Sequence, residues 1–141
     1  MKALEIRYLL DAGPLVARLN NRDAKNAWAN GVLNALTDDF GITETVLAEA
    51  AYHLRHGRPA LQGLMHMVEC GFLKVFPVVA EAPARIAELL AKYSQMDLGD
   101  ATLVVLSERY PRAKLITIDS DFIVYRRKDG KAVPSIMPPV S

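Results

Sequence analysis

Two aspartates each follow a short apolar run, and they are the first place to look for chemistry in this chain. Asp11 comes after the run Tyr8–Leu10, and Asp119 ends the similar run 114–118. Runs that are apolar on both faces are typical of strands in a parallel sheet covered on both sides. Because the carboxyl ends of parallel strands meet at one edge, where ligands bind in open sheets, we expect the two carboxylates at the same edge.

Asp11 also has a purely structural interpretation. Gly13 and Pro14 mark a break after the strand, and Pro14 suits the first position of a helix, where its missing N–H costs nothing. Asp11 would then be the N-cap of that helix. Taken alone, the residue fits both interpretations equally well, so the decision depends on whether other acids meet it.

Two further acids lie on predicted helices. Glu49 stands at the edge of the apolar stripe of a predicted helix over 44–54, with His53 one turn further on the same side. For Glu49 alone, a solvated side chain is the simpler interpretation. Asp97 suits the N-cap of a later helix that is apolar nearly all round, and Asp100 lies in its first turn. Asp100 directly precedes the buried face and would lose solvation unless a cation offset its charge.

Asp11, Glu49, Asp100 and Asp119 together indicate a metal site. Four carboxylates in one cleft would repel one another and raise each other's pKa values unless a cation were present. Hard oxygen ligands of this kind select Mg²⁺ or Mn²⁺. One or two such ions would lower the pKa of a bound water and neutralise charge on a phosphodiester during in-line attack. The chemistry indicated is metal-assisted phosphodiester hydrolysis.

Strands alternate with helices along the whole chain, which predicts an α/β fold with a mostly parallel sheet, since parallel strands need crossover connections. We expect strands over 8–10, 40–43, 72–76 and 114–118, with 8–10 in the centre of the sheet and 72–76 nearer an edge. We expect helices over 15–19, around Trp28, over 44–54, 60–68 and 82–93, and from Asp97 onward. Residues 123–125 would be extended, Asp129-Gly130 signals a hairpin, and three prolines after 133 keep the tail at an edge or irregular.

The composition predicts one domain over 1–141. With 51% hydrophobic and 23% charged residues, the chain is neither disordered nor membrane-embedded. No apolar run approaches the roughly 18 residues of a membrane span, and no apolar segment resembles a signal peptide. We therefore expect a cytoplasmic protein without membrane association. A net charge of +1 argues against coating nucleic acid through bulk charge and leaves room for a local basic patch.

Several other kinds of site are excluded. The single cysteine, Cys70, rules out an internal disulfide and a zinc cluster, and we expect it to be a small core residue before the turn at Gly71. The chain has no dinucleotide or nucleotide-triphosphate loop and no serine-nucleophile elbow. A receiver-like signalling module also binds Mg²⁺ at a parallel sheet edge, but it would need an acceptor Asp on a middle strand, and 72–78 ends without one.

In its motifs the chain resembles a PIN domain, in particular the VapC-type toxin ribonucleases of toxin–antitoxin systems. The resemblance covers nearly the whole chain and rests on four motifs in this order: Leu10–Ala17; Thr45–Glu49 leading to Tyr52-His53-Leu54; Asp100-Ala101; and Thr117–Asp119 with Asp121-Phe122 and Val124–Arg126. It implies a three-layer α/β/α sandwich, an acidic cluster that binds Mg²⁺ or Mn²⁺, and cleavage of RNA. It also implies an antitoxin protein that blocks the site, and a homodimer.

The resemblance extends to single residues. It implies that the four ligands and catalytic acids are, in chain order, Asp11, Glu49, Asp100 and Asp119. Thr117 would be the polar support of the last acid, and two additional acids, Asp97 and Asp121, would stand behind the ligands.

Two features leave alternatives open. Many PIN domains have Ser, Thr or Asn shortly after the first acid, where this chain has Ala12 and Gly13. The alternative function is therefore a catalytically weak binding module of the same fold that acts through a protein or RNA partner. Arg126 and Arg127 belong to the densest basic cluster and would bind RNA phosphates, unless this cluster is only a solvated strand edge.

Overall fold

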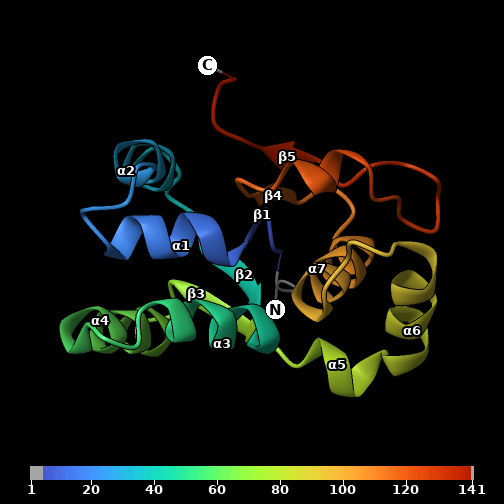
Figure 1. Cartoon of the computed structure of the whole chain (residues 1–141), viewed down its shortest axis with the longest axis horizontal. Helices are drawn as coiled ribbons and strands as arrows, with labels where there is room; N and C mark the ends of the chain where they lie inside the picture. Colours follow the sequence, from blue (N-terminus) through green and yellow to red (C-terminus); the bar gives the residue numbers. More distant parts are fainter. Residues whose placement is uncertain (1–4, 141) are drawn as a thin grey trace.

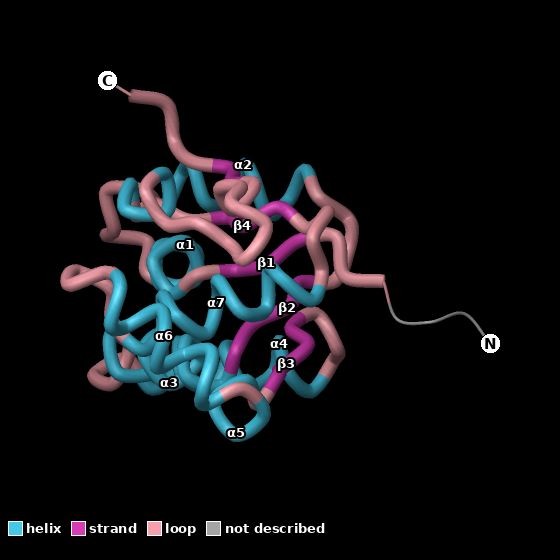
Figure 2. The backbone as a smooth tube through the Cα atoms, turned by 90° about the vertical axis from the view of Figure 1, so that its right-hand side faces the viewer, coloured by secondary structure: helices cyan, strands magenta, loops and turns pink. Residues whose placement is uncertain are grey.

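The computed structural model describes residues 5–140, and in this part of the chain five strands form one sheet. The strands are β1 (Tyr8–Leu10), β2 (Phe40–Thr43), β3 (Leu73–Phe76), β4 (Lys114–Ile116) and β5 (Ser135–Ile136). Their order is β3-β2-β1-β4-β5, and every neighbouring pair is parallel. Figure 2 shows β4, β1, β2 and β3 one below the other. The expected parallel sheet is confirmed, with β1 in its centre and β3 at an edge.

Helices cover both faces of this sheet, as expected for a three-layer α/β/α sandwich (Figure 1). The helices to the left and lower left in Figure 1 are α1 (Ala12–Leu19), α2 (Asn26–Ala35), α3 (Glu44–His53) and α4 (Arg58–Glu69). Those to the right are α5 (Val78–Glu81), α6 (Pro83–Lys92) and α7 (Leu98–Arg109). The first group connects β1 to β2 and β2 to β3, and the second group forms the crossover from β3 to β4.

The chain changes its direction of winding at β1. It proceeds from β1 to β2 and β3 on one side, and then crosses to β4 and β5 on the other. Leu10 pairs with Ile116, and the backbone N–H of Asp11 donates to the carbonyl of Ile116 at 3.0 Å. In such a sheet the connections at two adjacent strands lie on opposite faces, and a crevice opens at their carboxyl ends. The first predicted acid stands directly at this crevice.

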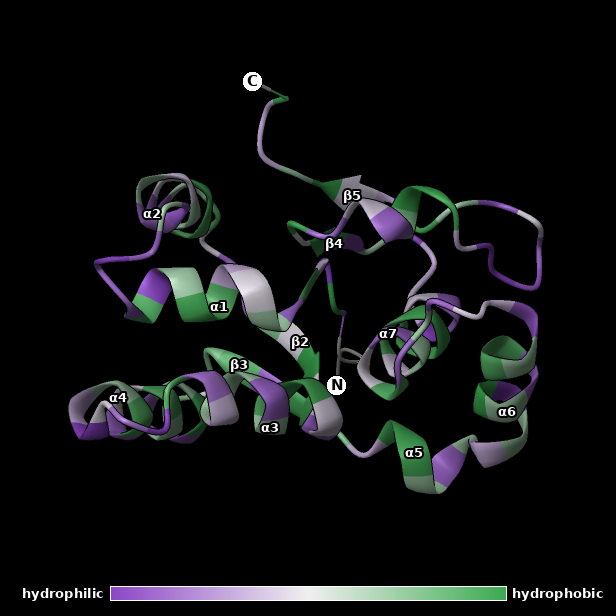
Figure 3. Ribbon diagram, viewed as in Figure 1, coloured by the Kyte–Doolittle hydropathy of each residue, from purple (hydrophilic) through white to green (hydrophobic). Residues whose placement is uncertain are grey.

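The core includes buried residues from helices in both groups, and α7 is the most deeply buried of the helices. All residues of α7 from Gly99 to Ser107 are buried, and the helix contacts β2, α3 and α6. A helix that is apolar nearly all round requires such cover on more than one side. Figure 3 shows that hydrophilic residues gather instead in peripheral connections, such as the one between α1 and α2.

The structure differs from the sequence-based expectations at two junctions. The helix expected over 82–93 is confirmed as α6 (Pro83–Lys92), but the short helix α5 before it was not predicted. The two are separate helices because a proline disfavours the helical conformation of the residue before it, and Ala82 is non-helical (φ −139°, ψ 48°). The segment 123–125 is not extended. Residues Ser120–Ile123 form the 3₁₀ helix η1, since the carboxylate of Asp119 accepts a hydrogen bond from the backbone N–H of Asp121 at 2.9 Å and turns the chain.

The structure also differs from two other local predictions, those for Pro14 and Cys70. Pro14 is the third residue of α1 rather than the first, which is still a position without an intrahelical N–H partner. Cys70 is exposed and is not a core residue, because it caps the C-terminus of α4 beyond the apolar face of that helix. At Asp129-Gly130 the expected turn is present, with Gly130 at φ 80° and a bridge between Arg126 and Ala132.

Within residues 5–140, none of the helices has the length and apolar character needed to cross a membrane.

Candidate active site

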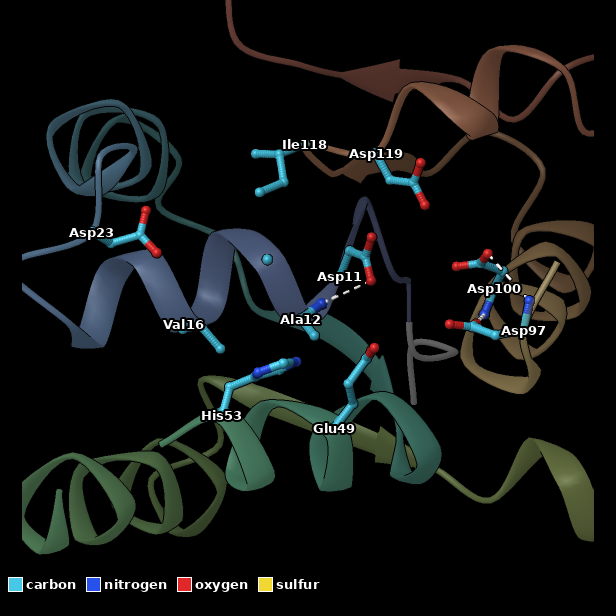
Figure 4. Close-up of a pocket in the computed structure, with 11 residues that line it drawn as sticks. Asp11, Ala12, Val16, Asp23, Glu49, His53, Asp97, Asp100, Ile118 and Asp119 are labelled. Atoms are coloured by element: carbon cyan, nitrogen blue, oxygen red, sulfur yellow. Dashed lines mark hydrogen bonds between the residues drawn. The ribbon is translucent and has the colours of Figure 1, made fainter. Parts of the chain in front are cut away.

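A pocket opens where the carboxyl ends of β1 and β4 meet α3 and the start of α7 (Figure 4). The four acids predicted as ligands, which come from separate parts of the chain, all line it. The lining residues are Asp11, Ala12, Gly13, Val16, Asp23, Glu49, His53, Asp97, Asp100, Ile118 and Asp119. The structure therefore brings the predicted acids to a single place.

Asp11 combines both of the interpretations that its sequence context left open. One carboxylate oxygen, Oδ1, accepts a hydrogen bond from the backbone N–H of Ala12 at 2.8 Å, which caps α1. The other, Oδ2, accepts one from the Thr117 hydroxyl at 2.7 Å. The residue is nearly buried, with 8% of its surface exposed. Its carboxylate is thus held in one orientation by two donors while it faces the pocket.

Thr117 serves the first acid as well as the last. Its hydroxyl donates to Asp11 and accepts the backbone N–H of Asp119 at 3.0 Å. This hydroxyl links the ends of β1 and β4, which are neighbours in the sheet. Asp121 does not line the pocket; its backbone N–H donates to the Asp119 carboxylate and fixes that side chain.

Asp97 and Asp100 form a capping box at the start of α7. The backbone N–H of Asp100 donates to Asp97 Oδ1 at 2.8 Å, and the backbone N–H of Asp97 approaches Asp100 Oδ2 at 3.4 Å. The box explains both acids as helix chemistry, yet both also line the pocket. Asp97 is therefore at the pocket wall itself and not behind it.

A tyrosine that the sequence did not single out as a site residue orients Asp100. The hydroxyl of Tyr125, which is fully buried, donates to Asp100 Oδ2 at 3.0 Å. Edge-on contacts with Tyr93 and Phe122, with ring centroids 5.1 and 5.2 Å away, hold the ring. Tyr125 is thus a positioning residue for the third acid.

Glu49 reaches the pocket from α3. Its Oε2 lies 3.6 Å from the place where a Cβ on Gly99 would stand, so the glycine permits α3 and α7 to approach closely here. A buried pair of hydroxyls holds the two helices together. Thr43 caps α3 by accepting the backbone N–H of Val46 and lies 2.9 Å from the hydroxyl of Thr102 in α7.

The packing of these acids raises their pKa values. Burial raises the pKa of Asp100 to about 7, and the charge of Asp97 adds to the effect. Burial also raises the pKa of Asp11, against the hydrogen bond from Thr117, and raises that of Glu49, with the charges of Asp97 and Asp11 acting in the same direction. Among the described residues that line the pocket there is no Lys or Arg. The pocket is strongly anionic, as predicted for a cation site.

The donor set fits a hard divalent ion in kind, because carboxylate oxygens are the ligands that Mg²⁺ and Mn²⁺ prefer. Its spacing is more open than that of a preformed site. Within residues 5–140, no group of three or more His, Cys, Asp or Glu side chains is arranged closely enough to hold one metal ion. The structure therefore supplies the charge and the donors, whereas a closed coordination shell is not built into it.

Arg126 and Arg127, the two predicted substrate contacts, lie outside the acidic pocket. The side chain of Arg127 is buried, and its guanidinium donates to the carbonyls of Ser107 and Pro111 and lies 3.4 Å from Asp129. The guanidinium of Arg126 donates to three backbone carbonyls at the end of η1. Neither residue lines the acidic pocket. Arg127 is a structural residue that fastens the loop to α7, so its side chain is not available to contact a phosphate.

The glycine at position 13 has a steric explanation, because a larger residue there would collide with Ile118. A Cβ at this position would lie 2.7 Å from Cγ1 and 2.8 Å from Cδ1 of Ile118, which lines the same pocket. A serine or threonine here would require Ile118 to move. The lack of a hydroxyl after Asp11 is therefore linked to Ile118, which occupies the space that a side chain at position 13 would need.

Sequence reasoning missed two other polar lining residues as site residues, Asp23 and His53. His53 had a signal, since it lies one helical turn after Glu49 on the same side. Asp23 had none, because its place in the pocket depends on how the α1–α2 connection folds back (Figure 4).

Two solved structures share the fold. VapC20 from Mycobacterium tuberculosis, described as a toxin that cleaves the sarcin–ricin loop, matches with a TM-score of 0.75 and 18% identity, over 83% of this chain and 93% of that one. VapBC2 from Rickettsia felis, bound to a DNA fragment from its promoter, matches with a TM-score of 0.62 and 18% identity, over 95% and 100%. The chain has the PIN-like α/β/α fold of these VapC structures, as its motifs predicted. No family model and no curated protein matches the sequence.

Proposed function

We propose that the protein is a metal-dependent endoribonuclease that hydrolyses RNA phosphodiester bonds with Asp11, Glu49, Asp100 and Asp119. The observation that carries the proposal is the convergence of these acids, together with Asp97, on one pocket that no described Lys or Arg lines. The likeness in fold to a toxin that cleaves RNA supports the choice of substrate.

In this proposal the four carboxylates hold Mg²⁺ or Mn²⁺. The bound ion would supply a water of lowered pKa and neutralise charge on the phosphodiester. The residues of the chain prepare the site. Thr117 and the N–H of Ala12 orient Asp11, Tyr125 orients Asp100, and the turn at η1 orients Asp119. Preorganised groups of this kind cost no rearrangement at the moment of reaction.

The proposed biological role is that of a toxin paired with an antitoxin protein, supported by the likeness in fold to a VapBC complex. A homodimer belongs to the same proposal, because the resemblance to VapC-type proteins implies one. We also propose the cytoplasmic location that was expected from the sequence.

The substitution Asp11→Asn tests the catalytic assignment. It keeps the shape of the side chain and removes its charge, and we expect RNA cleavage in Mn²⁺ to fall at least about 100-fold, as for loss of a group that stabilises the transition state. Asp39→Asn is the matched control, because Asp39 is exposed just before the amino end of β2, whereas the pocket lies at the carboxyl ends of the strands. Equal cleavage rates for Asp11→Asn and the parent, measured on a labelled RNA by gel electrophoresis, would refute the assignment.

A second candidate is a catalytically weak binding module of the same fold. The open spacing of the acids and the lack of room for a side chain at position 13, next to Ile118, favour it. Calorimetric titration with Mn²⁺ separates the two candidates, because a weak module should bind little of the ion, whereas the nuclease should bind it at the acidic pocket.

A further inference from the structure

A second hollow adjoins the acidic pocket. It lies between the α1–α2 connection and the α3–α4 connection, and His53 lines both hollows. The other residues that line it are Leu19, Asn20, Asn21, Arg22, Leu54, His56, Gly57 and Ala60. A ligand that occupies the acidic pocket can therefore continue into this second hollow past His53.

The two hollows differ sharply in charge. The first is lined by Asp11, Asp23, Glu49 and further aspartates, whereas the described lining of the second contains no acid. Instead it presents Arg22 and His56 with two asparagines. Arginine is charged at every ordinary pH, and both side-chain types donate hydrogen bonds to phosphate oxygens. The second hollow thus has the chemistry to bind an anion and the first does not.

The loop that carries Arg22 is braced. Asn26 donates from its amide to the carbonyl of Ala17 at 2.6 Å and approaches that of Asn20 at 3.3 Å. The Asn20 side chain in turn accepts the backbone N–H of Arg22 at 3.1 Å. Figure 3 shows this connection as hydrophilic. A braced loop presents the exposed Arg22 side chain from a fixed place, which lowers the entropy lost when a ligand binds.

We propose that this second hollow binds the sugar–phosphate backbone of single-stranded RNA beside the scissile bond, with Arg22 and His56 as its phosphate contacts. The inference rests on the proposed nuclease function. A strand whose scissile phosphate lies at Asp11 must place its neighbouring phosphates outside the acidic pocket, where their charge would be repelled. The hollow that opens past His53 is lined with donors and without acids. It takes the place of Arg127, whose side chain is buried, as a phosphate contact.

Fluorescence anisotropy with a labelled single-stranded RNA tests this assignment. All variants carry Asp100→Asn so that the RNA stays intact, and binding is measured over a range of salt concentrations. We expect Arg22→Ala to weaken binding about fivefold and to flatten the slope of log K against log salt by about 0.7, the value for one phosphate contact on a single strand. Arg22→Lys keeps the charge and should keep the slope. His56→Ala should weaken binding about threefold through a lost hydrogen bond.

Arg112→Ala is the matched control, because its removal changes the net charge equally. Arg112 is exposed in the α7–β4 turn, at the amino end of β4 and so at the end of the strand away from the pocket. Melting curves check that each variant is folded. The assignment is overturned if Arg22→Ala binds RNA with the parent's affinity and slope, or if Arg112→Ala weakens binding as much. It is also overturned if unlabelled polyglutamate displaces the RNA as well as RNA itself does, since the hollow would then suit an acidic protein segment.

Cleavage by the chain without substitutions, in Mn²⁺, separates this inference from the proposed function. If that chain cuts RNA while Arg22 has no effect on binding, the hollow is wrongly assigned and the nuclease stands. If Arg22 contributes to binding and the chain does not cut, the hollow stands as an RNA site and the nuclease fails.

Discussion

Asp11 caps a helix and faces the pocket at the same time, which shows how few residues carry this site. Its two oxygens accept from Ala12 and Thr117, and the same Thr117 hydroxyl accepts from the backbone of Asp119. One hydroxyl therefore orients the Asp11 carboxylate and holds the backbone of Asp119, just beyond the ends of two adjacent strands. The sequence left open whether Asp11 is a helix cap or a pocket acid, and in the folded chain it is both.

Tyr125→Phe tests whether the buried hydroxyl positions Asp100. The hydrogen bond stabilises the charged carboxylate, so its loss should destabilise the protein by about 1 kcal/mol at neutral pH. It should also slow RNA cleavage roughly tenfold with little change in KM, because misplacing a catalytic group by a fraction of an ångström is costly. Tyr110→Phe is the control, since Tyr110 packs on Phe76 away from the pocket. A rate equal to that of the control would show that Tyr125 is only a core residue.

The raised pKa of Asp100 predicts how stability depends on pH. The native state holds this proton up to about pH 7, whereas the unfolded chain releases it near the ordinary value of 3.8. Protonation therefore favours the native state, and the stability that it provides is present at low pH and is lost as the pH rises from about 4 to 7. The raised pKa values of Asp11 and Glu49 act with the same sign.

Asp100→Asn should therefore raise the melting temperature in EDTA at pH 8, by roughly 5 °C, and leave it nearly unchanged at pH 4. The measurement is a thermal melt of parent and variant at both pH values. A lower melting temperature for the variant at pH 8 would contradict the buried charge that we assign to Asp100.

At the scale of elements, the buried hydroxyl pair couples α3 to α7 and so Glu49 to Asp100. Thr102 donates to the carbonyl of Gly99 at 2.7 Å, so the bond between the two hydroxyls uses the proton of Thr43. Thr43→Val removes this donor and the helix cap together and should cost about 1 to 2 kcal/mol.

A double-mutant cycle with Thr102→Val measures the coupling. Because the two side chains share one bond, the double variant should lose less stability than the two single variants summed, by at least about 0.5 kcal/mol. Urea unfolding of the four proteins gives the value. Simple additivity would show that each hydroxyl acts alone and that the helices are held by apolar packing.

The elements could largely be predicted because their signals are local. β1 and α7 are apolar on all sides, and α3 has both a cap and a stripe, so their positions follow from periodicity. The short helix α5 before Pro83 and the 3₁₀ turn after Asp119 were not predicted, because they depend on single residues and not on a helix or strand periodicity. Elements with one dominant pattern are predictable, and junctions between them are not.

The site was predictable to the same degree. Four acids at strand ends and helix edges were expected to meet, and all four line one pocket. The contacts of Arg127, Tyr125 and Asp23 depend on tertiary packing between distant segments, which no local pattern encodes. Basic residues beside a hairpin thus suggested a substrate surface where the folded chain has a buried brace.

At the scale of the whole molecule, a net charge of +1 conceals two opposite surfaces that lie side by side. The strand order places the acids at the switch between β1 and β4, and the α1–α2 connection brings Arg22 to the neighbouring hollow. A polyanion is attracted to one surface and requires a cation at the other. In the proposed function, this division lets the protein bind a strand at one hollow and act on one of its phosphates at the other.

The most direct test of the central claim is cleavage of a labelled RNA by the unsubstituted protein with Mn²⁺ and, in parallel, with EDTA. The acidic pocket predicts cleavage that appears with Mn²⁺, stops in EDTA and returns when Mn²⁺ is restored in excess. Cleavage that proceeds equally in EDTA, or no cleavage in Mn²⁺ by a folded protein, would contradict it.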